Sequence, residues 1–152
     1  MDTAAVYDAL SDDLKAEIEG LEIVHRQARS RRLLGLDHDA EKARELAARF
    51  PDMAHPLVRV DPSSGIRSLD ISPLFADAVA SWPADKSEAL LARLREFATQ
   101  SRFVYWHDWK ADDLIIWNNY RTLHSAAGHK NRYVRTMNRT TLTGEVDGRR
   151  AA

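Results

Sequence analysis

The stretch "WNNYRTLHSAAGHKNRYVRTMNRTTLTGE", residues 117–145, contains the most informative pattern in the chain. His124 precedes a run of β-branched and aromatic residues in which Arg135 and Arg139 stand four positions apart. Such residues favour β-strands, and residues 125–131 have the composition of a turn. In a simple antiparallel hairpin around this turn, His124 lies roughly opposite Arg135, with Cβ atoms about 4.5–5.5 Å apart. The sequence therefore predicts a histidine and a guanidinium in one small site.

The second arginine of this stretch extends the predicted site along the strand. Because side chains alternate, Arg135 and Arg139 share one face and stand about 13 Å apart. This separation suits two separate anions better than one. The planar fork of arginine binds both oxygens of a carboxylate and keeps its charge. A histidine and two arginines on a strand are also common as ordinary surface ion pairs, so both interpretations stay open on spacing alone.

Composition limits the classes of protein that the chain can belong to. Its 152 residues are enough for one domain with a hydrophobic core, and its 22 basic and 23 acidic residues nearly cancel. We therefore expect neither a nucleic-acid nor a membrane partner. The absence of cysteine excludes disulfides and thiolate metal sites, and the first residues, "MDTAAVYDAL", lack the pattern of a signal peptide. A cytoplasmic protein is the expectation.

The first third of the chain has helical periodicity. Apolar residues between positions 6 and 21 recur at helical spacing, with Ser11 as an N-cap, and predict one helix or two short ones. Residues 39–49 predict a charged surface helix that ends at the Phe50–Pro51 step. The polar stretch between these helices is expected to be a loop.

The rest of the chain changes towards strand patterns. Residues 55–72 predict a hairpin around a turn at 61–65, and Ser87 is the expected N-cap of a helix that runs to about Thr99. Three aromatic and β-branched segments follow, at residues 102–109, 114–126 and 132–142. Helices first and antiparallel strands last predict an α+β fold that is mainly β, in which the sheet packs one face against helices or closes on another sheet.

Three parts of the chain resemble the C-terminal portion of the taurine and phenoxyacetate dioxygenases, which are iron(II)- and 2-oxoglutarate-dependent oxygenases. That family shows a Trp-Asp-Asn-Arg stretch, a histidine seven residues after the Trp, and arginines eleven and fifteen residues beyond the histidine. These spacings recur here at Trp117, His124, Arg135 and Arg139. The stretches "HPLVRVDPSSGIRSL", from residue 55, and "YDALSDDLKAEIEGLEIVH", from residue 7, resemble the family's hairpin and the helix after its metal-binding loop.

The resemblance implies a fold and a set of roles. The fold is a double-stranded β-helix, or jelly roll, with about residues 1–52 as a helical insert and 53–152 as barrel strands plus one helix. His124 is implied as one ligand of Fe(II), Arg135 as the group that holds 2-oxoglutarate, and Arg139 as the group that holds the substrate. Trp117 is implied as an aromatic residue near the iron. The partners implied are a small organic acid, such as a sulfonate or carboxylate, and O2.

The sequence also departs from the family. The other two iron ligands form a His-x-Asp or His-x-Glu motif, because residues i and i+2 project to one side of an extended segment. None of the six histidines of this chain is followed two positions later by Asp or Glu. The motif lies upstream of the helix that begins this chain, so we expect a partial domain. Asn118 and Tyr120 replace the usual Asp and Arg, and we expect weaker hydrogen bonding around His124.

Two hypotheses follow from this pattern. The first is a dioxygenase, represented by its C-terminal part, which by itself does not turn over 2-oxoglutarate. The second is a non-catalytic domain of the same fold that binds acids weakly or serves as an interaction module. In either case an incomplete barrel leaves an unpaired strand edge, and such edges favour self-association.

Overall fold

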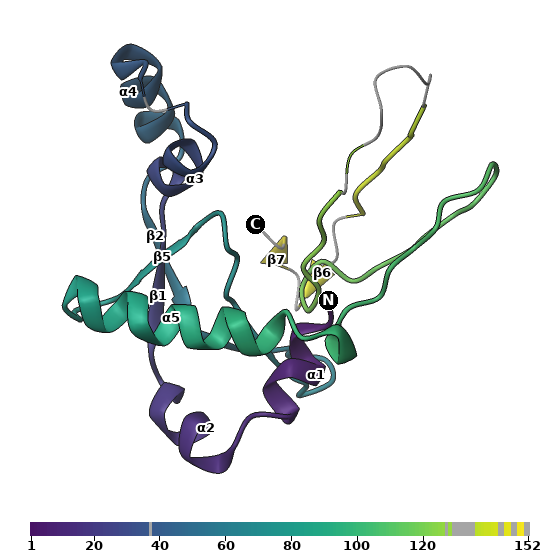
Figure 1. The fold of residues 1–152 in the computed structure, drawn as a ribbon, viewed down its shortest axis with the longest axis horizontal. Coiled ribbons are helices and arrows are strands. Elements are labelled where there is room, and N and C mark those ends of the chain that lie inside the picture. The colour runs from purple at the N-terminus through teal and green to yellow at the C-terminus, as the bar shows by residue number, and fades with distance from the viewer. Residues whose placement is uncertain (37, 127, 129–135, 143–144, 147–148, 151–152) are drawn as a thin grey trace.

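The computed structural model describes residues 1–36, 38–126, 128 and 136–142, together with the backbone of 145–146 and 149–150. The helices are α1 Thr3–Asp8, α2 Asp12–Ile18, α3 Gln27–Leu33, α4 Ala40–Arg49, α5 Ala84–Ala98 and the short 3-10 helix η1 Ser101–Phe103. The strands are β1 Glu22–His25, β2 Met53–Pro56, β3 Val58–Val60, β4 Arg67–Leu69, β5 Ala76–Val79, β6 Glu145–Val146 and β7 Arg149–Arg150. Helix α5 crosses the lower half of the view, with α1 and α2 below it (Figure 1). Two arms rise above α5: the first ends in α3 and α4, and the second is formed by the extended segments after η1.

Three small antiparallel sheets organise the chain. Strand β1 lies between β2 and β5, β3 pairs with β4, and β6 pairs with β7. The register between β1 and β5 shifts at Val24 and His25, which marks a β-bulge. The three-stranded sheet joins segments that are far apart in the sequence, and its strand β5 contacts α5.

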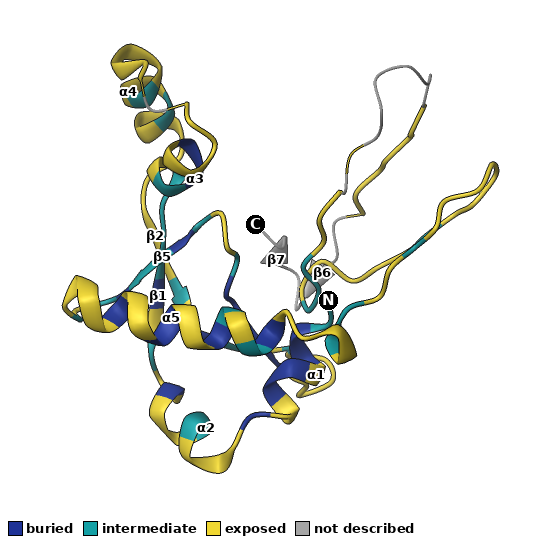
Figure 2. Cartoon of the chain, viewed as in Figure 1, coloured by how far each residue is buried: buried dark blue, intermediate teal, exposed yellow. Residues whose placement is uncertain are grey.

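The hydrophobic core lies between α5, α1 and the sheets. Its largest fully buried side chains are Ile18, Ile23, Leu57, Ile71, Leu91 and Leu94. Buried residues follow the side of α1 and α5 that faces the strands, whereas α4 is almost wholly exposed (Figure 2). Leu90, Leu91 and Leu94 of α5 form part of this core.

Several local predictions agree with the structure. Ser11 caps α2 by accepting a hydrogen bond from the backbone N–H of Leu14 at 3.3 Å, and the periodic stretch forms two short helices. Helix α4 ends at Phe50, before the proline. The predicted hairpin forms as β3 and β4, closed by a turn in which Gly65 has a φ of 70°. These features depend on neighbouring residues alone.

Two predictions about local structure were wrong. The expected loop between the first helices and residue 39 contains β1 and α3. Strand β1 is only four residues long, and what stabilises it is pairing with β2 and β5, which lie about 30 and 50 residues later in the chain. Ser87 does not cap α5, since this helix begins at Ala84 and Pro83 occupies the N-cap position.

The C-terminal segments also differ from the prediction. Within the part of the chain that the structure describes, residues 104–117 and 136–142 are extended but form no strand, and helix exceeds strand overall. The description "mainly β" is therefore wrong for these residues, and α5 packs against β5 and α1 rather than against C-terminal strands. Where the structure describes them, these segments pair with no strand, and large apolar side chains such as Trp106, Leu114 and Ile116 are exposed (Figure 2). No helix in the described ranges is long and apolar enough to cross a membrane.

Candidate functional site

Three of the four predicted site residues lie together on the second arm. The ring centroids of Trp117 and His124 are 5.2 Å apart with planes inclined at 56°. The guanidinium carbon of Arg139 lies 6.0 Å from the centre of the Trp117 ring, within range of a cation–π contact. Both the imidazole and the guanidinium therefore lie close to the Trp117 ring. Arg135 lies outside the described residues, so its position opposite His124 stays a prediction.

The loop that carries these residues is built by the asparagines after Trp117. The side-chain oxygen of Asn118 accepts a hydrogen bond from the backbone N–H of Tyr120 at 2.7 Å, which forms an Asx-turn. Its carbonyl accepts a bond from the Thr122 hydroxyl at 2.7 Å. The Trp117 indole N–H donates to the Asn119 side chain at 2.7 Å and so fixes the ring.

The end of the loop is held by the beginning of the chain. The backbone N–H of Thr3 donates to the Arg121 carbonyl at 2.8 Å, and the Leu123 N–H donates to the Met1 carbonyl at 3.1 Å. Arg121 also pairs with Asp2 at 2.7 Å. Burial raises the pKa of Asp2, but hydrogen bonds from Arg121 and two backbone N–H groups outweigh it, and the pKa lies below its ordinary value. His124 therefore follows directly after residues whose backbone is hydrogen-bonded to Met1 and Thr3.

A buried charge network lies on the other side of the loop. Asp70 is 7% exposed; it pairs with Arg59, and its Oδ2 lies 3.2 Å from Nε2 of His25. Burial raises the pKa of the Asp70 carboxyl, but the contact with His25 and the charge of Arg59 outweigh this, so the pKa is lowered. The Arg59 guanidinium in turn lies 5.5 Å from the centre of the Tyr120 ring. Sequence reasoning missed this network, because Arg59 and Tyr120 are 61 positions apart and no local pattern indicates their contact.

The residues present can be tested against a metal centre. Among the residues that the structure describes, no group of three His, Asp or Glu side chains could hold a metal ion. His124 is exposed, beside Trp117, and offers a single nitrogen ligand. A facial triad requires two histidines and one carboxylate. The described part of this chain can therefore supply one of the three ligands of such a centre, but not all three.

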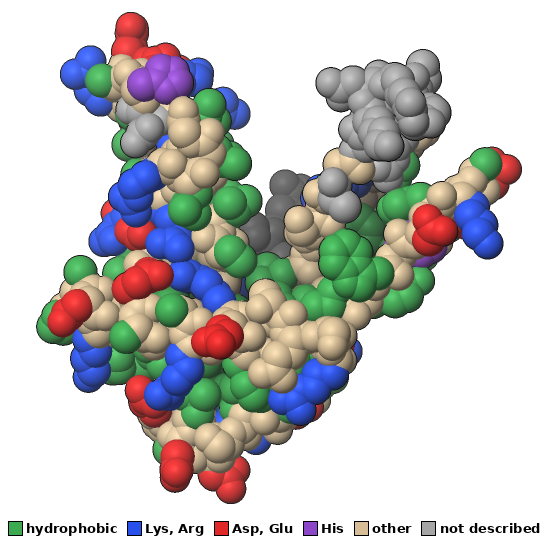
Figure 3. Space-filling view, viewed as in Figure 1, with side chains coloured by type: hydrophobic (Ala, Val, Ile, Leu, Met, Phe, Trp, Pro, Cys, Tyr) green, Lys and Arg blue, Asp and Glu red, His purple; other side chains and the backbone are tan. Residues whose placement is uncertain are grey.

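Three arginines that follow His25 in the sequence form ion pairs that stabilise the fold. Asp77 on β5 contacts three guanidinium groups, those of Arg26 at 2.8 Å, Arg29 at 3.4 Å and Arg32 at 3.3 Å. Figure 3 shows basic side chains gathered where α3 approaches α5. Hydrogen bonds from Arg26 and Arg29 outweigh the effect of burial, which alone would raise the Asp77 pKa, and lower it. These arginines stabilise the contact of α3 with β5.

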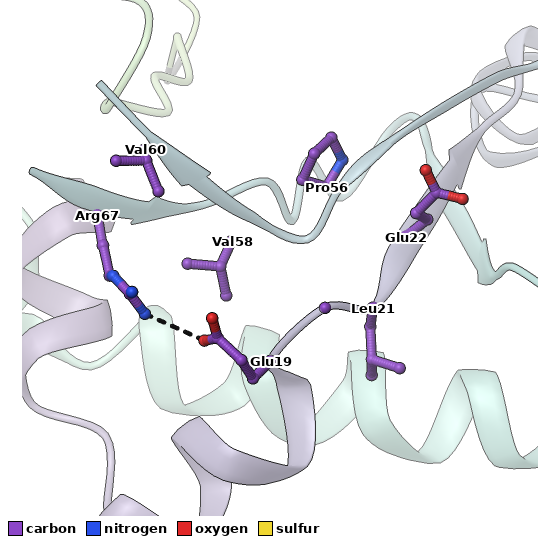
Figure 4. A pocket seen from close by; sticks show the side chains of 8 residues that line it. Glu19, Leu21, Glu22, Pro56, Val58, Val60 and Arg67 are labelled. Atoms are coloured by element: carbon purple, nitrogen blue, oxygen red, sulfur yellow. Dashed lines mark hydrogen bonds and ion pairs between the residues drawn. The ribbon is translucent and has the colours of Figure 1, made fainter. Parts of the chain in front are cut away.

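Two pockets lie away from the predicted site. The larger, of about 350 Å³, is lined by residues of the loop after α2 and of the two hairpin sheets, with Arg67 paired to Glu19 at 3.1 Å across it (Figure 4). The smaller, of about 160 Å³, lies against His25 and His55, whose rings meet edge to face at 5.3 Å. Neither pocket is lined by Trp117, His124 or Arg139.

Comparison with known proteins identifies the class. The model of the "Taurine catabolism dioxygenase TauD, TfdA family" matches residues 1–141, and the chain belongs to this family. It is 40% identical over 145 residues to an alpha-ketoglutarate-dependent 2,4-dichlorophenoxyacetate dioxygenase of Cupriavidus pinatubonensis (strain JMP 134 / LMG 1197), covering 95% of this chain and 49% of that protein. It is 34% identical over 149 residues to an (S)-phenoxypropionate/alpha-ketoglutarate-dioxygenase of Sphingobium herbicidovorans, covering 95% of this chain and 51% of the relative. The chain spans about half the length of the curated relatives that it matches, and corresponds to their C-terminal portion.

Solved structures give the same result. A structure of AAD-2 in complex with Mn(II) and N-oxalylglycine matches 72% of this chain and 42% of that chain, with a TM-score of 0.64 and 38% identity. A taurine dioxygenase from Burkholderia xenovorans matches 72% of this chain and 32% of its own, with a TM-score of 0.56 and 33% identity. The α+β arrangement is thus that of TauD-like dioxygenases.

Proposed function

We propose that this chain forms the C-terminal part of an Fe(II)- and 2-oxoglutarate-dependent dioxygenase that hydroxylates a small organic acid, a sulfonate or a carboxylate. The coupled reaction is the oxidative decarboxylation of 2-oxoglutarate to succinate and CO2. The observation that carries the proposal is the grouping of Trp117, His124 and Arg139 within a segment that matches the family model. The double-stranded β-helix is the corresponding proposal for the fold.

Each residue has a role that its chemistry allows. His124 contributes one imidazole ligand, and iron, when bound, supplies the activation of O2. Arg135 holds the far carboxylate of 2-oxoglutarate, and Arg139 holds the acidic group of the substrate, since a guanidinium binds both oxygens of an anion. Trp117 packs near both the His124 ring and the Arg139 charge, as an aromatic residue beside the proposed metal ligand.

A fusion protein tests this proposal. The upstream half of the Cupriavidus pinatubonensis relative, joined in front of this chain, supplies the part of the family that the present residues do not match. With Fe(II), ascorbate, 2-oxoglutarate and phenoxyacetate or an organic sulfonate, the fusion should form succinate. The 152-residue chain alone should not.

The control for the fusion is its His124→Ala variant, which removes one ligand and leaves the rest of the chain intact. Succinate at the level of this variant, from a fusion whose circular dichroism shows it to be folded, contradicts the proposed function. Succinate production by the isolated chain above its own His124→Ala control contradicts the assignment of a single ligand.

A second candidate function is that of a non-catalytic interaction module. The support for it is the exposure of large apolar side chains on the second arm, including Trp106 at 78%, Leu114 at 84% and Ile116 at 87%. Contiguous apolar surface of this kind marks interaction sites. An inactive fusion together with tight association of the chain with a polypeptide partner would favour this candidate.

A further inference from the structure

Arg59 occupies a bridging position between the core and the site loop. One end of its guanidinium pairs with Asp70, which is almost fully buried, and the carbon of the same group lies 5.5 Å from the centre of the Tyr120 ring. Tyr120 lies between Trp117 and His124 in the chain. A contact at Tyr120 therefore acts on the loop that carries both site residues.

We propose that Arg59 is a positioning residue, which holds the loop of residues 117–124 through the face of Tyr120 and so orients His124 and Trp117. The proposal deepens the proposed function and rests on it only in taking His124 as the metal ligand. Arg59 does not touch the candidate site itself in any contact that the structure describes. Its effect passes through Tyr120.

The geometry of Arg59 makes it a firm anchor. It lies on β3, opposite Ser68 of β4, so its backbone is fixed by the hairpin. Its charge is held by Asp70, which follows β4 directly and also contacts His25 on β1. An arginine paired with a buried carboxylate keeps one orientation, because breaking the pair leaves a charge buried without its partner.

Tyr120 is the part of the loop that needs such an anchor. Residues 121–123 are already held by backbone hydrogen bonds to Met1 and Thr3. Before them, within the described residues, the loop is held by bonds of its own members, from Tyr120 and Thr122 to Asn118. The Arg59 contact is thus the link between this half of the loop and the core. A guanidinium over an aromatic face is attracted by the ring quadrupole.

Hydrogen exchange of the isolated chain, measured by NMR without metal or cosubstrate, tests the proposal. In Tyr120→Leu, which removes the aromatic face, the amides of residues 120 and 121, which donate to Asn118, should exchange about two- to fivefold faster. Tyr120→Phe keeps the face and should exchange as the unchanged chain does. Arg59→Gln should reproduce the effect of Tyr120→Leu, and the double variant should add little to either.

The NMR signals of the site supply a second readout. The Trp117 indole N–H and the His124 ring protons should shift in Tyr120→Leu and in Arg59→Gln, and return to their original positions in Tyr120→Phe. Amides of β3, β4 and α5 should keep their exchange rates in the Tyr120 variants. This pattern separates positioning from a general loss of stability.

Three outcomes overturn the proposal. One is unchanged loop exchange in Tyr120→Leu; another is an equal effect of Tyr120→Phe and Tyr120→Leu. The third is a rise in exchange that is uniform over the whole chain. Because Tyr120 makes no contact with Asp70, its variants remain informative even if Arg59→Gln fails to fold. An inactive fusion protein would refute the dioxygenase function while leaving these exchange results unaffected.

Discussion

Asp70 is a residue whose charge connects three strands. It is buried, follows β4, pairs with Arg59 of β3 and contacts His25 of β1. Two separate sheets are thereby joined through one carboxylate. Removal of such a charge leaves its partners in the same low-dielectric surroundings, which is more costly than loss of the pair itself.

We expect Asp70→Asn to lower the free energy of unfolding by about 3 kcal/mol, because the half-buried Arg59 keeps its charge without a counterion. Urea denaturation followed by circular dichroism at neutral pH measures the change. Asp8→Asn is the matched control, since Asp8 is an exposed residue at the end of α1. A loss for Asp70→Asn no larger than that for the control would contradict the prediction.

The same carboxylate predicts a dependence on pH. The pKa of Asp70 is lower in the folded chain than its ordinary value, so its contribution is fully present above the unfolded pKa of about 3.9. It is lost as the pH falls through the folded pKa, because the unfolded chain then binds more protons. The stability difference between the unchanged chain and Asp70→Asn should therefore shrink below about pH 4. A difference that is constant from pH 7 to acid, in urea titrations at several pH values, would refute this sign.

The two arginines of the proposed site should act on different ligands. In the fusion protein, Arg135→Ala should raise the apparent KM for 2-oxoglutarate by about tenfold to a hundredfold, the loss expected for a charge-assisted bidentate contact. Arg139→Ala should instead weaken binding of the organic acid and leave uncoupled succinate formation largely intact. Saturation curves for both ligands, measured for each variant, test this assignment. A shift of the same curve in both variants would show that two anions are not divided between two arginines.

Among the elements, α5 illustrates how a side chain can have a role that its sequence position conceals. Serine is a favoured N-cap residue, but Ser87 lies in the first turn of a helix that begins at Ala84. Its hydroxyl accepts a hydrogen bond from the backbone N–H of Val79 at 3.1 Å, and the contact is buried. Ser87 thus ties α5 to the end of β5.

We expect Ser87→Ala to cost about 1–3 kcal/mol of unfolding free energy, because the buried N–H of Val79 loses its acceptor. Glu96→Ala, on the exposed side of the same helix, should stay within about 0.5 kcal/mol of the unchanged chain. Thermal and urea unfolding compare the two. Equal effects of the two variants would show that the Ser87 contact adds nothing to stability.

At the scale of the whole molecule, the second arm stands out because many of its large apolar side chains are exposed. Its segments are extended, unpaired in the described residues and rich in exposed apolar side chains. Leu114 and Ile116, two positions apart on one face of an extended segment, are exposed by 84% and 87%. Such edges invite pairing with another chain.

We therefore expect the purified chain to self-associate in a concentration-dependent way. Leu114→Lys combined with Ile116→Lys should lower the association, since charge on an edge strand opposes pairing. The stability of the core should stay unchanged, because both side chains are exposed. Sedimentation velocity over a range of concentrations measures the association. A stable monomer at every concentration would refute the expectation.

The sequence by itself determined the features that depend on near neighbours. These are the Ser11 cap, the end of α4 before Pro51, and the β3–β4 hairpin with its glycine turn. Caps, turns and periodicity act within a few residues, so they can be recognised before the chain is folded. The family spacing of Trp117, His124 and Arg139 also lies in a short stretch, and the structure brings these three side chains together.

Only the tertiary structure decided the features that join distant residues. Strand β1 forms because β2 and β5 pair with it, and the C-terminal segments form no strand in the described residues because they have no such partner. Arg59 lies 11 positions from Asp70 and 61 positions from Tyr120 in the sequence. No local sequence pattern indicates either contact. The physical reason is that pairing and burial of charge depend on which surfaces meet after the chain has folded.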